Sequence, residues 1–172
     1  HIEVCRDLAG TFNHLYGDDV FRLPKPKLVA GAAKVPGTDG QKMSKSYKNT
    51  IELFEELPAQ KKKIMRITTD SRSMEEPKDP QQDHLYQLFS LVGAEKEVVE
   101  MAELYRRGGF GYGEVKKAVV AAAKEAFVAA RERRCELESN PSRIDEILAV
   151  GAERARIVAG NVLERAREAC GL

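Results

Sequence analysis

Apolar residues recur along most of this chain at three- and four-residue intervals, the spacing that gathers them on one face of a helix. The first stripe covers residues 1–16 and ends before Gly17-Asp18-Asp19. The same periodicity predicts further helices over residues 83–91, 94–106, 114–137 and 141–169. Pro141 suits the first turn of the last one, and Gly171 suits its end.

Small residues interrupt the apolar stripe of the long final helix. We expect this stripe to be buried and to approach another helix closely. Its members are Ile144, Leu148, Gly151, Ala155, Val162 and Ala166.

Prolines and glycines dominate residues 20–40, which excludes a long helix there. The apolar pieces Val20-Phe21 and Leu28-Val29-Ala30 are expected to be short strands or extended segments, and residues 36–40 a turn. Asn49, followed three residues later by Glu52, has the form of a capping box and predicts a helix over Thr50–Leu57.

Two further features follow the predicted helix at residues 50–57. Pro58 is expected in the first turn of the next helix, and residues 68–81 in a long loop. The chain thus changes character near residue 50, from an α/β-like segment to helices, and the predicted class is mainly α.

Composition narrows the possible functions. Lys and Arg number 28 and Asp and Glu 27, a net charge of +1, so any contact with nucleic acid must be a local patch. No apolar run approaches the roughly 20 residues of a membrane span. Three cysteines and three histidines lie far apart, without the spacing of a metal site or a disulfide framework. We expect a cytoplasmic protein without a structural metal.

The chain opens with His1, inside a helical pattern that no capping residue precedes. We therefore expect it to be the C-terminal part of a longer polypeptide.

One segment has side chains suited to catalysis or ligand binding. Gln41–Asn49 places three lysines and two serines on a turn rich in glycine and proline. Ammonium groups on flexible stems suit phosphate oxygens that gain charge during a reaction, and hydroxyl and free backbone N–H groups add neutral donors. In phosphoryl or nucleotidyl transfer a protein chiefly positions groups and stabilises negative charge. By residue type alone, a solvated lysine-rich turn is the favoured explanation of the segment.

The exact sequence of this segment favours a phosphate-binding function over a solvated turn. Residues 42–46 read KMSKS, the complete signature pentapeptide of class I aminoacyl-tRNA synthetases. Its surroundings resemble one branch of the bacterial tryptophanyl-tRNA synthetases over essentially the whole chain. The supporting matches are Val35-Pro36-Gly37-x-Asp39-Gly40, Tyr47-x-Asn49-Thr50-Ile51, Phe12-Asn13-x-Leu15-Tyr16-Gly17, Thr69-Asp70-Ser71, Gly113-Glu114-Val115-Lys116 and Gly151-Ala152-Glu153-Arg154-Ala155.

The resemblance implies two domains. Residues 1–49 would be the C-terminal end of a Rossmann-like catalytic domain, including the KMSKS loop, and residues 50–172 a helical anticodon-binding domain. Such an enzyme activates L-tryptophan with ATP and Mg²⁺ to tryptophanyl-adenylate and transfers the amino acid to tRNA(Trp). The family forms homodimers.

The resemblance also implies roles for single residues. Lys42 and Lys45 would stabilise the pyrophosphate leaving group, and Met43, Ser44 and Ser46 would shape the loop and contact the nucleotide. The Val35 backbone would lie near the adenine. No protein ligand to a metal is implied. The family's H-I-G-H-type motif and most of its tryptophan pocket are absent, so this chain alone should not form the adenylate.

Three other interpretations stay open at this stage. A tyrosyl-tRNA synthetase shares the loop and the type of helical domain, although no additional RNA-binding tail follows here. A free-standing helical RNA-binding module could use Lys61, Lys62, Lys63 and Arg66, or Arg131, Arg133 and Arg134. Neighbouring glutamates make both clusters equally compatible with solvated helix faces. A purely structural helix bundle leaves the KMSKS loop unexplained.

Overall fold

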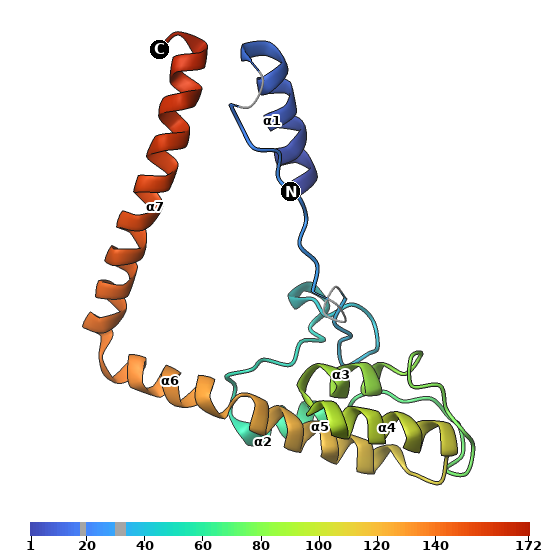
Figure 1. Ribbon diagram of the computed structural model, residues 1–172. Helices are drawn as coiled ribbons and strands as arrows, with labels where there is room; N and C mark the ends of the chain where they lie inside the picture. Colours follow the sequence, from blue (N-terminus) through green and yellow to red (C-terminus); the bar gives the residue numbers. More distant parts are fainter. Residues whose placement is uncertain (18–19, 30–33) are drawn as a thin grey trace. The chain divides into compact units, whose positions relative to one another are not determined.

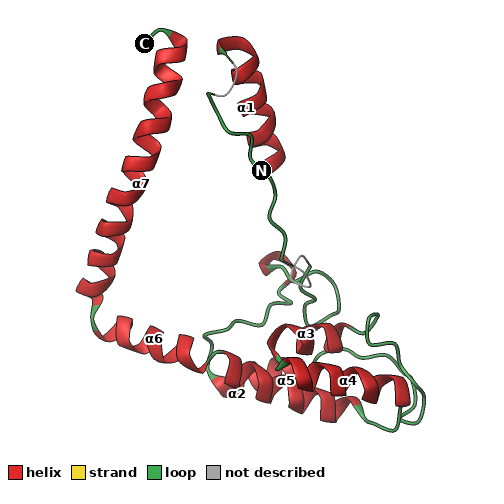
Figure 2. Ribbon diagram, in the orientation of Figure 1, coloured by secondary structure: helices red, strands yellow, loops and turns green. Residues whose placement is uncertain are grey.

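Helices account for almost all regular structure in the computed structural model, which describes residues 1–17, 20–29 and 34–172 (Figure 1 and Figure 2). They are α1 (Ile2–Tyr16), the short 3-10 helix η1 (Lys45–Tyr47), α2 (Leu57–Met65), α3 (His84–Val92), α4 (Glu95–Arg107), α5 (Tyr112–Ala126), α6 (Val128–Ser139) and α7 (Pro141–Cys170). No strand occurs among the described residues, which confirms the mainly α class.

The apolar pieces before residue 30 form no strand. Residues 22–29 have no regular structure, and Ala30 lies outside the described residues. A strand is therefore excluded for residues 20–29. The described part of the chain contains one isolated antiparallel bridge, between Pro36 and Lys42.

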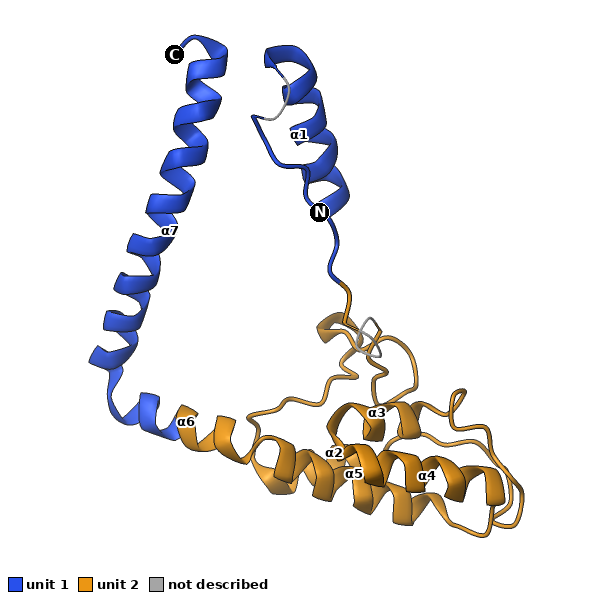
Figure 3. Ribbon diagram, in the orientation of Figure 1, with its two compact units in different colours: residues 1–27, 135–172 blue, residues 28–134 orange. Residues whose placement is uncertain are grey.

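The chain divides into two units (Figure 3). Unit 1 comprises residues 1–27 and 135–172, and unit 2 comprises residues 28–134. No helix of the described residues is long and apolar enough to cross a membrane.

The hydrophobic core belongs to unit 2. α5 packs against both α2 and α3, and α3 also contacts α4. The predicted faces supply the core side chains, among them Ala102 and Tyr105 of α4 and Val115 and Val119 of α5. The remaining buried members are Ile64, Ile67, Leu85, Tyr86, Leu88, Phe89 and Phe110.

Glycine makes the corner between α4 and α5 possible. Gly108 caps α4 with φ +76°, in the left-handed region, and a Cβ there would collide with the backbone carbonyl of Glu75. The long loop before α3 therefore passes directly against this corner.

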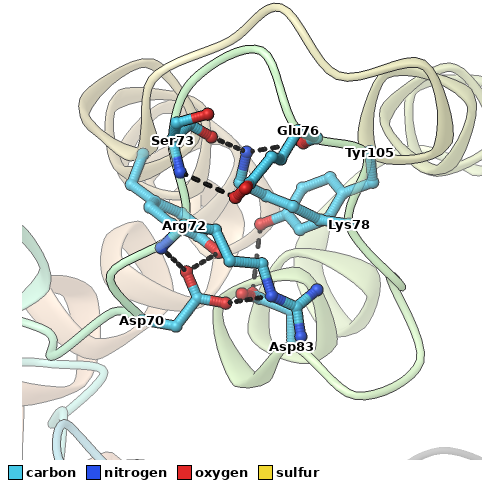
Figure 4. Close-up of polar contacts among 8 residues, drawn as sticks. Asp70, Arg72, Ser73, Glu76, Lys78, Asp83 and Tyr105 are labelled. Atoms are coloured by element: carbon cyan, nitrogen blue, oxygen red, sulfur yellow. Dashed lines mark hydrogen bonds and ion pairs between the residues drawn. The ribbon is translucent and has the colours of Figure 1, made fainter.

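The loop of residues 68–82 is held by a buried lysine. Lys78 is 4% exposed, and its Nζ donates to the carbonyls of Ser73 (2.8 Å) and Glu76 (3.0 Å), as Figure 4 shows. The same ammonium lies 4.5 Å from the centre of the Phe110 ring, at the corner before α5. A buried charge with these partners ties the loop to the core.

Two helix predictions were wrong. Residues 50–56 form turns rather than a helix, because the Asn49 side chain that would cap it bonds to the preceding loop instead. The helix predicted over 114–137 is divided at Phe127 into α5 and α6. Neither glycine nor proline marks that division, so the periodicity could not show it.

Unit 1 contains two amphipathic helices. α1 ends at Gly17 as predicted, and the Asn13 amide fixes the returning chain by bonding both the N–H and the carbonyl of Phe21, each at 2.8 Å. α7 ends at Gly171 in the left-handed conformation. No residue of α1 or α7 is buried, so the prediction of a buried stripe on α7 was wrong: Leu148 is 64% exposed.

We expect Tyr105→Phe to destabilise unit 2 by about 1–2 kcal/mol, measured by urea unfolding at pH 7. The fully buried Tyr105 hydroxyl donates to Asp83 Oδ1 at 3.0 Å, and phenylalanine leaves that acceptor without it. Tyr47→Phe is the control, because Tyr47 is 65% exposed. Equal stability of the two variants would contradict the assignment.

Alkaline pH should destabilise the same unit. Burial, and then the Asp83 charge, raise the pKa of Tyr105 far above its ordinary value of 10.0. Above pH 10 the unfolded chain therefore ionises this hydroxyl while the folded chain keeps it protonated, and stability falls as pH rises. Urea midpoints between pH 8 and 11 should show a smaller decline in Tyr105→Phe than in the parent chain.

Candidate functional site

The KMSKS residues lie on a tight antiparallel turn. The Gly37 N–H donates to the Gln41 carbonyl at 2.6 Å, and the Met43 N–H donates to the Val35 carbonyl at 2.8 Å. Gly40 closes the turn with φ +80° and an N–H that donates to Gly37 O. This turn presents residues 42–46 at its exit.

Asn49 fixes the loop from within. Its side chain is 2% exposed; Oδ1 accepts from the Ser44 N–H at 2.7 Å, and Nδ2 donates to Asp39 Oδ1 (2.8 Å) and the Lys42 carbonyl (3.2 Å). Its own carbonyl accepts from the Thr38 N–H at 3.0 Å. One amide thus joins both sides of the turn to the middle of the KMSKS string.

Gly37 leaves room for this amide. A Cβ at Gly37 would overlap the Asn49 side chain. The hydrogen bond from Asn49 also lowers the pKa of Asp39, whose Oδ1 accepts in addition from the Gln41 N–H at 3.0 Å. The carboxylate therefore stays ionised and belongs to the frame of the turn.

The loop separates core-facing from solvent-facing side chains. Val35 and Met43 are half-buried and pack against the hydrophobic core of unit 2, while Lys42 and Lys45 are exposed. Ser44 is the N-cap of η1, and its Oγ accepts from the Ser46 N–H at 3.3 Å. The six predicted site residues thus share one rigid turn, but the two ammonium groups are free of its hydrogen-bond frame.

A polar cavity of about 620 Å³ lies between this turn and the N-terminal part of α3. Lys42 lines it but Lys45 does not, so within this chain the two predicted lysines do not meet in one cavity. The opposite wall carries Gln82 and His84, which the sequence analysis did not select. Isolated glutamines and a histidine have no distinctive spacing, so no sequence signal identifies them.

The turn is also bonded to the loop before α3. The Thr68 N–H donates to the Thr38 carbonyl at 3.1 Å, and His84 Nε2 donates to the Thr68 carbonyl at 2.5 Å. The His84 ring packs against Gly40, where an added Cβ would lie 3.1 Å from Nδ1. Three hydrogen-bonded segments of unit 2 therefore position the KMSKS loop.

The two predicted basic clusters differ. Lys63 pairs with Glu55 at 2.8 Å, whereas Lys61 and Lys62 are exposed. Arg131 donates to the Glu55 carbonyl at 3.0 Å, and the Arg134 guanidinium lies 5.0 Å from the centre of the Phe54 ring. The arginines of α6 thus make contacts within unit 2. A phosphate-binding role of the α2 lysines stays a prediction.

No group of three or more His, Cys, Asp or Glu side chains that could hold a metal ion occurs within the described part of the chain.

Asn49→Ala should release the KMSKS loop. It removes three hydrogen bonds and a buried amide, and we expect a loss of about 2–4 kcal/mol in urea unfolding together with fast hydrogen exchange at the Ser44 amide. Asn49→Asp should behave similarly, because it places a second carboxylate oxygen against Asp39. Asn140→Ala, at an exposed helix start, is the control. Unchanged protection of the Ser44 amide would refute the role of Asn49.

Comparisons with known proteins place the chain in a family. The family model for tRNA synthetases class I (W and Y) matches residues 1–128. The chain is 59% identical over 172 residues to a tryptophan–tRNA ligase of Rhodopirellula baltica and 41% identical over 174 residues to one of Fusobacterium nucleatum. Each comparison covers 100% of this chain and 53% of the relative, so the chain spans about half the length of these curated relatives.

Solved structures agree with this placement. The tryptophanyl-tRNA synthetase from Campylobacter jejuni complexed with ADP and tryptophan is 38% identical, with a TM-score of 0.74 over 100% of this chain and 54% of that one. The Mycoplasma pneumoniae enzyme, at 20% identity and a TM-score of 0.79, shares the fold. The chain belongs to the class I tRNA synthetases of the tryptophan and tyrosine group.

Proposed function

We propose that this chain supplies the KMSKS loop and the helical tRNA-binding part of a tryptophan–tRNA ligase. The observation that carries the proposal is a complete KMSKS string on the turn fixed by Asn49, in a chain 59% identical to a tryptophan–tRNA ligase. The complete enzyme would form tryptophanyl-adenylate from L-tryptophan and ATP and transfer the tryptophanyl group to tRNA(Trp).

The geometry of the loop suits this chemistry. Lys42 and Lys45 would stabilise the charge that develops on pyrophosphate while the tryptophan carboxylate attacks the α-phosphorus. Because the hydrogen-bond frame involves backbone and the Asn49 amide, both ammonium groups can follow the phosphates as bonds change. Ser44, Ser46 and the Met43 segment would contact the nucleotide, with the Val35 backbone near the adenine.

Mg²⁺ would enter with the ATP phosphates. Asp39 is the carboxylate of the turn itself, and it already accepts from Asn49 and from the Gln41 N–H. The phosphate oxygens, rather than this carboxylate, would therefore hold the ion and neutralise part of their charge. The ADP present in the Campylobacter relative supports a nucleotide site in this family.

Domain roles follow from the same proposal. Residues 1–49 would complete a Rossmann-like catalytic domain and residues 50–172 would recognise the anticodon region. The complete enzyme would be a cytoplasmic homodimer. A tyrosine-specific enzyme is less well supported, because the family model covers both groups whereas the relatives named above are tryptophan–tRNA ligases. A free-standing RNA-binding module gives no account of the complete pentapeptide string.

A chimera tests the catalytic lysines. Residues 1–172 would replace the corresponding half of the Rhodopirellula ligase, and tryptophan-dependent ATP–pyrophosphate exchange would be measured. Lys42→Ala and Lys45→Ala should each reduce kcat by about 10²–10³, because each removes a charge that stabilises the transition state. Lys117→Ala, on the exposed side of α5, is the matched control. Exchange at the parental rate in both loop variants would overturn the assignment.

A separate measurement tests the amino acid specificity. The chimera should exchange pyrophosphate with L-tryptophan and not with L-tyrosine, and the 172-residue chain alone should do neither, since most of the amino acid pocket lies in the other half. Exchange that depends on tyrosine would favour the tyrosyl alternative. Exchange by the isolated chain would show that the pocket is complete within these residues.

A further inference from the structure

A groove of about 690 Å³ lies between α4 and α5 in unit 2. Both helices contact α3, and Figure 1 shows the three helices close together. The lining residues lie between Glu97 and Arg107 on α4 and between Ala118 and Glu125 on α5, together with the buried Phe89 of α3. This α4–α5 groove shares no residue with the cavity beside the KMSKS turn.

The base of the groove is apolar. Ala102 and Tyr105 place one face of α4 in the hydrophobic core, whereas Met101 and Leu104 form an adjoining stripe that is only half-buried. The opposite wall consists of the small side chains Ala118, Ala121 and Ala122. α4 thus has a wider apolar face than the core covers, and the alanines of α5 leave space above it.

The groove has the length and spacing of a helix-binding site. Its residues recur on both walls at intervals of three and four positions, and α4 rises roughly 15 Å from Glu97 to Arg107, about three helical turns. Both walls are helices, whose backbone groups are bonded internally, so an extended segment would gain no backbone hydrogen bonds here. A helix satisfies its own backbone groups and can place an apolar stripe in such a groove.

The charges at the rim indicate the chemistry of that helix. Glu97, Glu100 and Glu125 are exposed and lie far along their helices from the corner that joins α4 to α5, whereas Arg107 lies next to it. Glu100 pairs with Lys96 at 3.7 Å, but both side chains are more than 60% exposed, so this ion pair is weak. Three carboxylates against one guanidinium disfavour a phosphate backbone and favour ammonium groups.

We propose that the α4–α5 groove binds an amphipathic helix of another protein, one with lysine or arginine residues beside its apolar stripe. The stripe would cover Met101 and Leu104, and the cationic side chains would pair with Glu97, Glu100 and Glu125. Apolar burial would supply most of the affinity, and the charges would fix which helix binds. The proposal uses no KMSKS residue and does not depend on the proposed function.

A labelled peptide of about 14 leucine and lysine residues, with leucine at helical spacing, is the probe. Fluorescence anisotropy with the 172-residue chain should give a dissociation constant at least about tenfold lower than for two control peptides. One control has the same composition in an order that leaves no apolar helix face, and the other has glutamate in place of lysine. Equal affinity for the three peptides would overturn the proposal.

Matched charge reversals locate the bound peptide. Glu100→Lys with Glu125→Lys, inside the groove, should raise the dissociation constant about tenfold. Glu103→Lys with Glu114→Lys changes the net charge equally on the same two helices but outside the groove, and should leave it within about twofold. All four glutamates are exposed, so circular dichroism should show an unchanged helix content. If a reversal loses helix, glutamine at the same positions should give the same ranking with smaller effects. Equal effects of the two pairs, as expected for binding to α1 or α7, would contradict the assignment.

The chimera shows whether another part of the enzyme covers the groove. It should bind the leucine–lysine peptide as tightly as the 172-residue chain does. Its mass in sedimentation should not change with Glu100→Lys and Glu125→Lys. Lost peptide binding would assign the groove to the other half of the enzyme, and a changed mass would assign it to a second copy; either result would overturn the proposal.

Discussion

The loop that would do the chemistry depends on one buried amide. Asn49 holds Asp39, the Lys42 carbonyl and the Ser44 N–H at once, and Gly37 gives it the space to do so. An amide is suited to this position because it both donates and accepts, whereas an aspartate could only accept. The arrangement separates two needs of a transferase loop, a fixed backbone and free cationic side chains. In the proposed reaction, flexible lysines would follow the phosphates without any movement of the turn that carries them.

Positioning of this turn comes from the helical part of the chain. A backbone hydrogen bond joins Thr38 to Thr68, and the His84 ring bonds to the Thr68 carbonyl. Met43 and Val35 pack against the core that α2, α3 and α5 build. The KMSKS loop accordingly lies within unit 2, together with residues 50–134. A shift of the helices would carry the loop with it.

The sequence predicted most of what depends on periodicity and capping. α3, α4 and α7 agree with their apolar spacing, and Gly17, Pro58 and Gly171 lie at the helix ends where their chemistry places them. The sequence-based prediction was wrong where one side chain can form two alternative sets of hydrogen bonds. Asn49 is a good helix cap, but its side chain bonds within the loop instead. It also could not show burial, because a stripe on α7 is defined by spacing alone while burial requires a partner surface. Lys42 and Lys45 were found only through their exact pentapeptide, and Gln82 and His84 come from helix α3 and its preceding loop without any motif.

The exposed stripes on α1 and α7 have a physical consequence. Amphipathic helices gain most of their stability from burying the apolar face, and α7 leaves Leu148, Ile157 and Val158 more than half exposed, at 64%, 59% and 67%. Unit 2, by contrast, buries complete side chains such as Tyr105 and Leu85. Stability is therefore concentrated where the loop is built, and α7 needs a covering surface before it can contribute. The hydrogen bonds and packing contacts that hold the KMSKS turn lie within unit 2. The turn can therefore keep its shape whether or not another surface covers the apolar faces of α1 and α7.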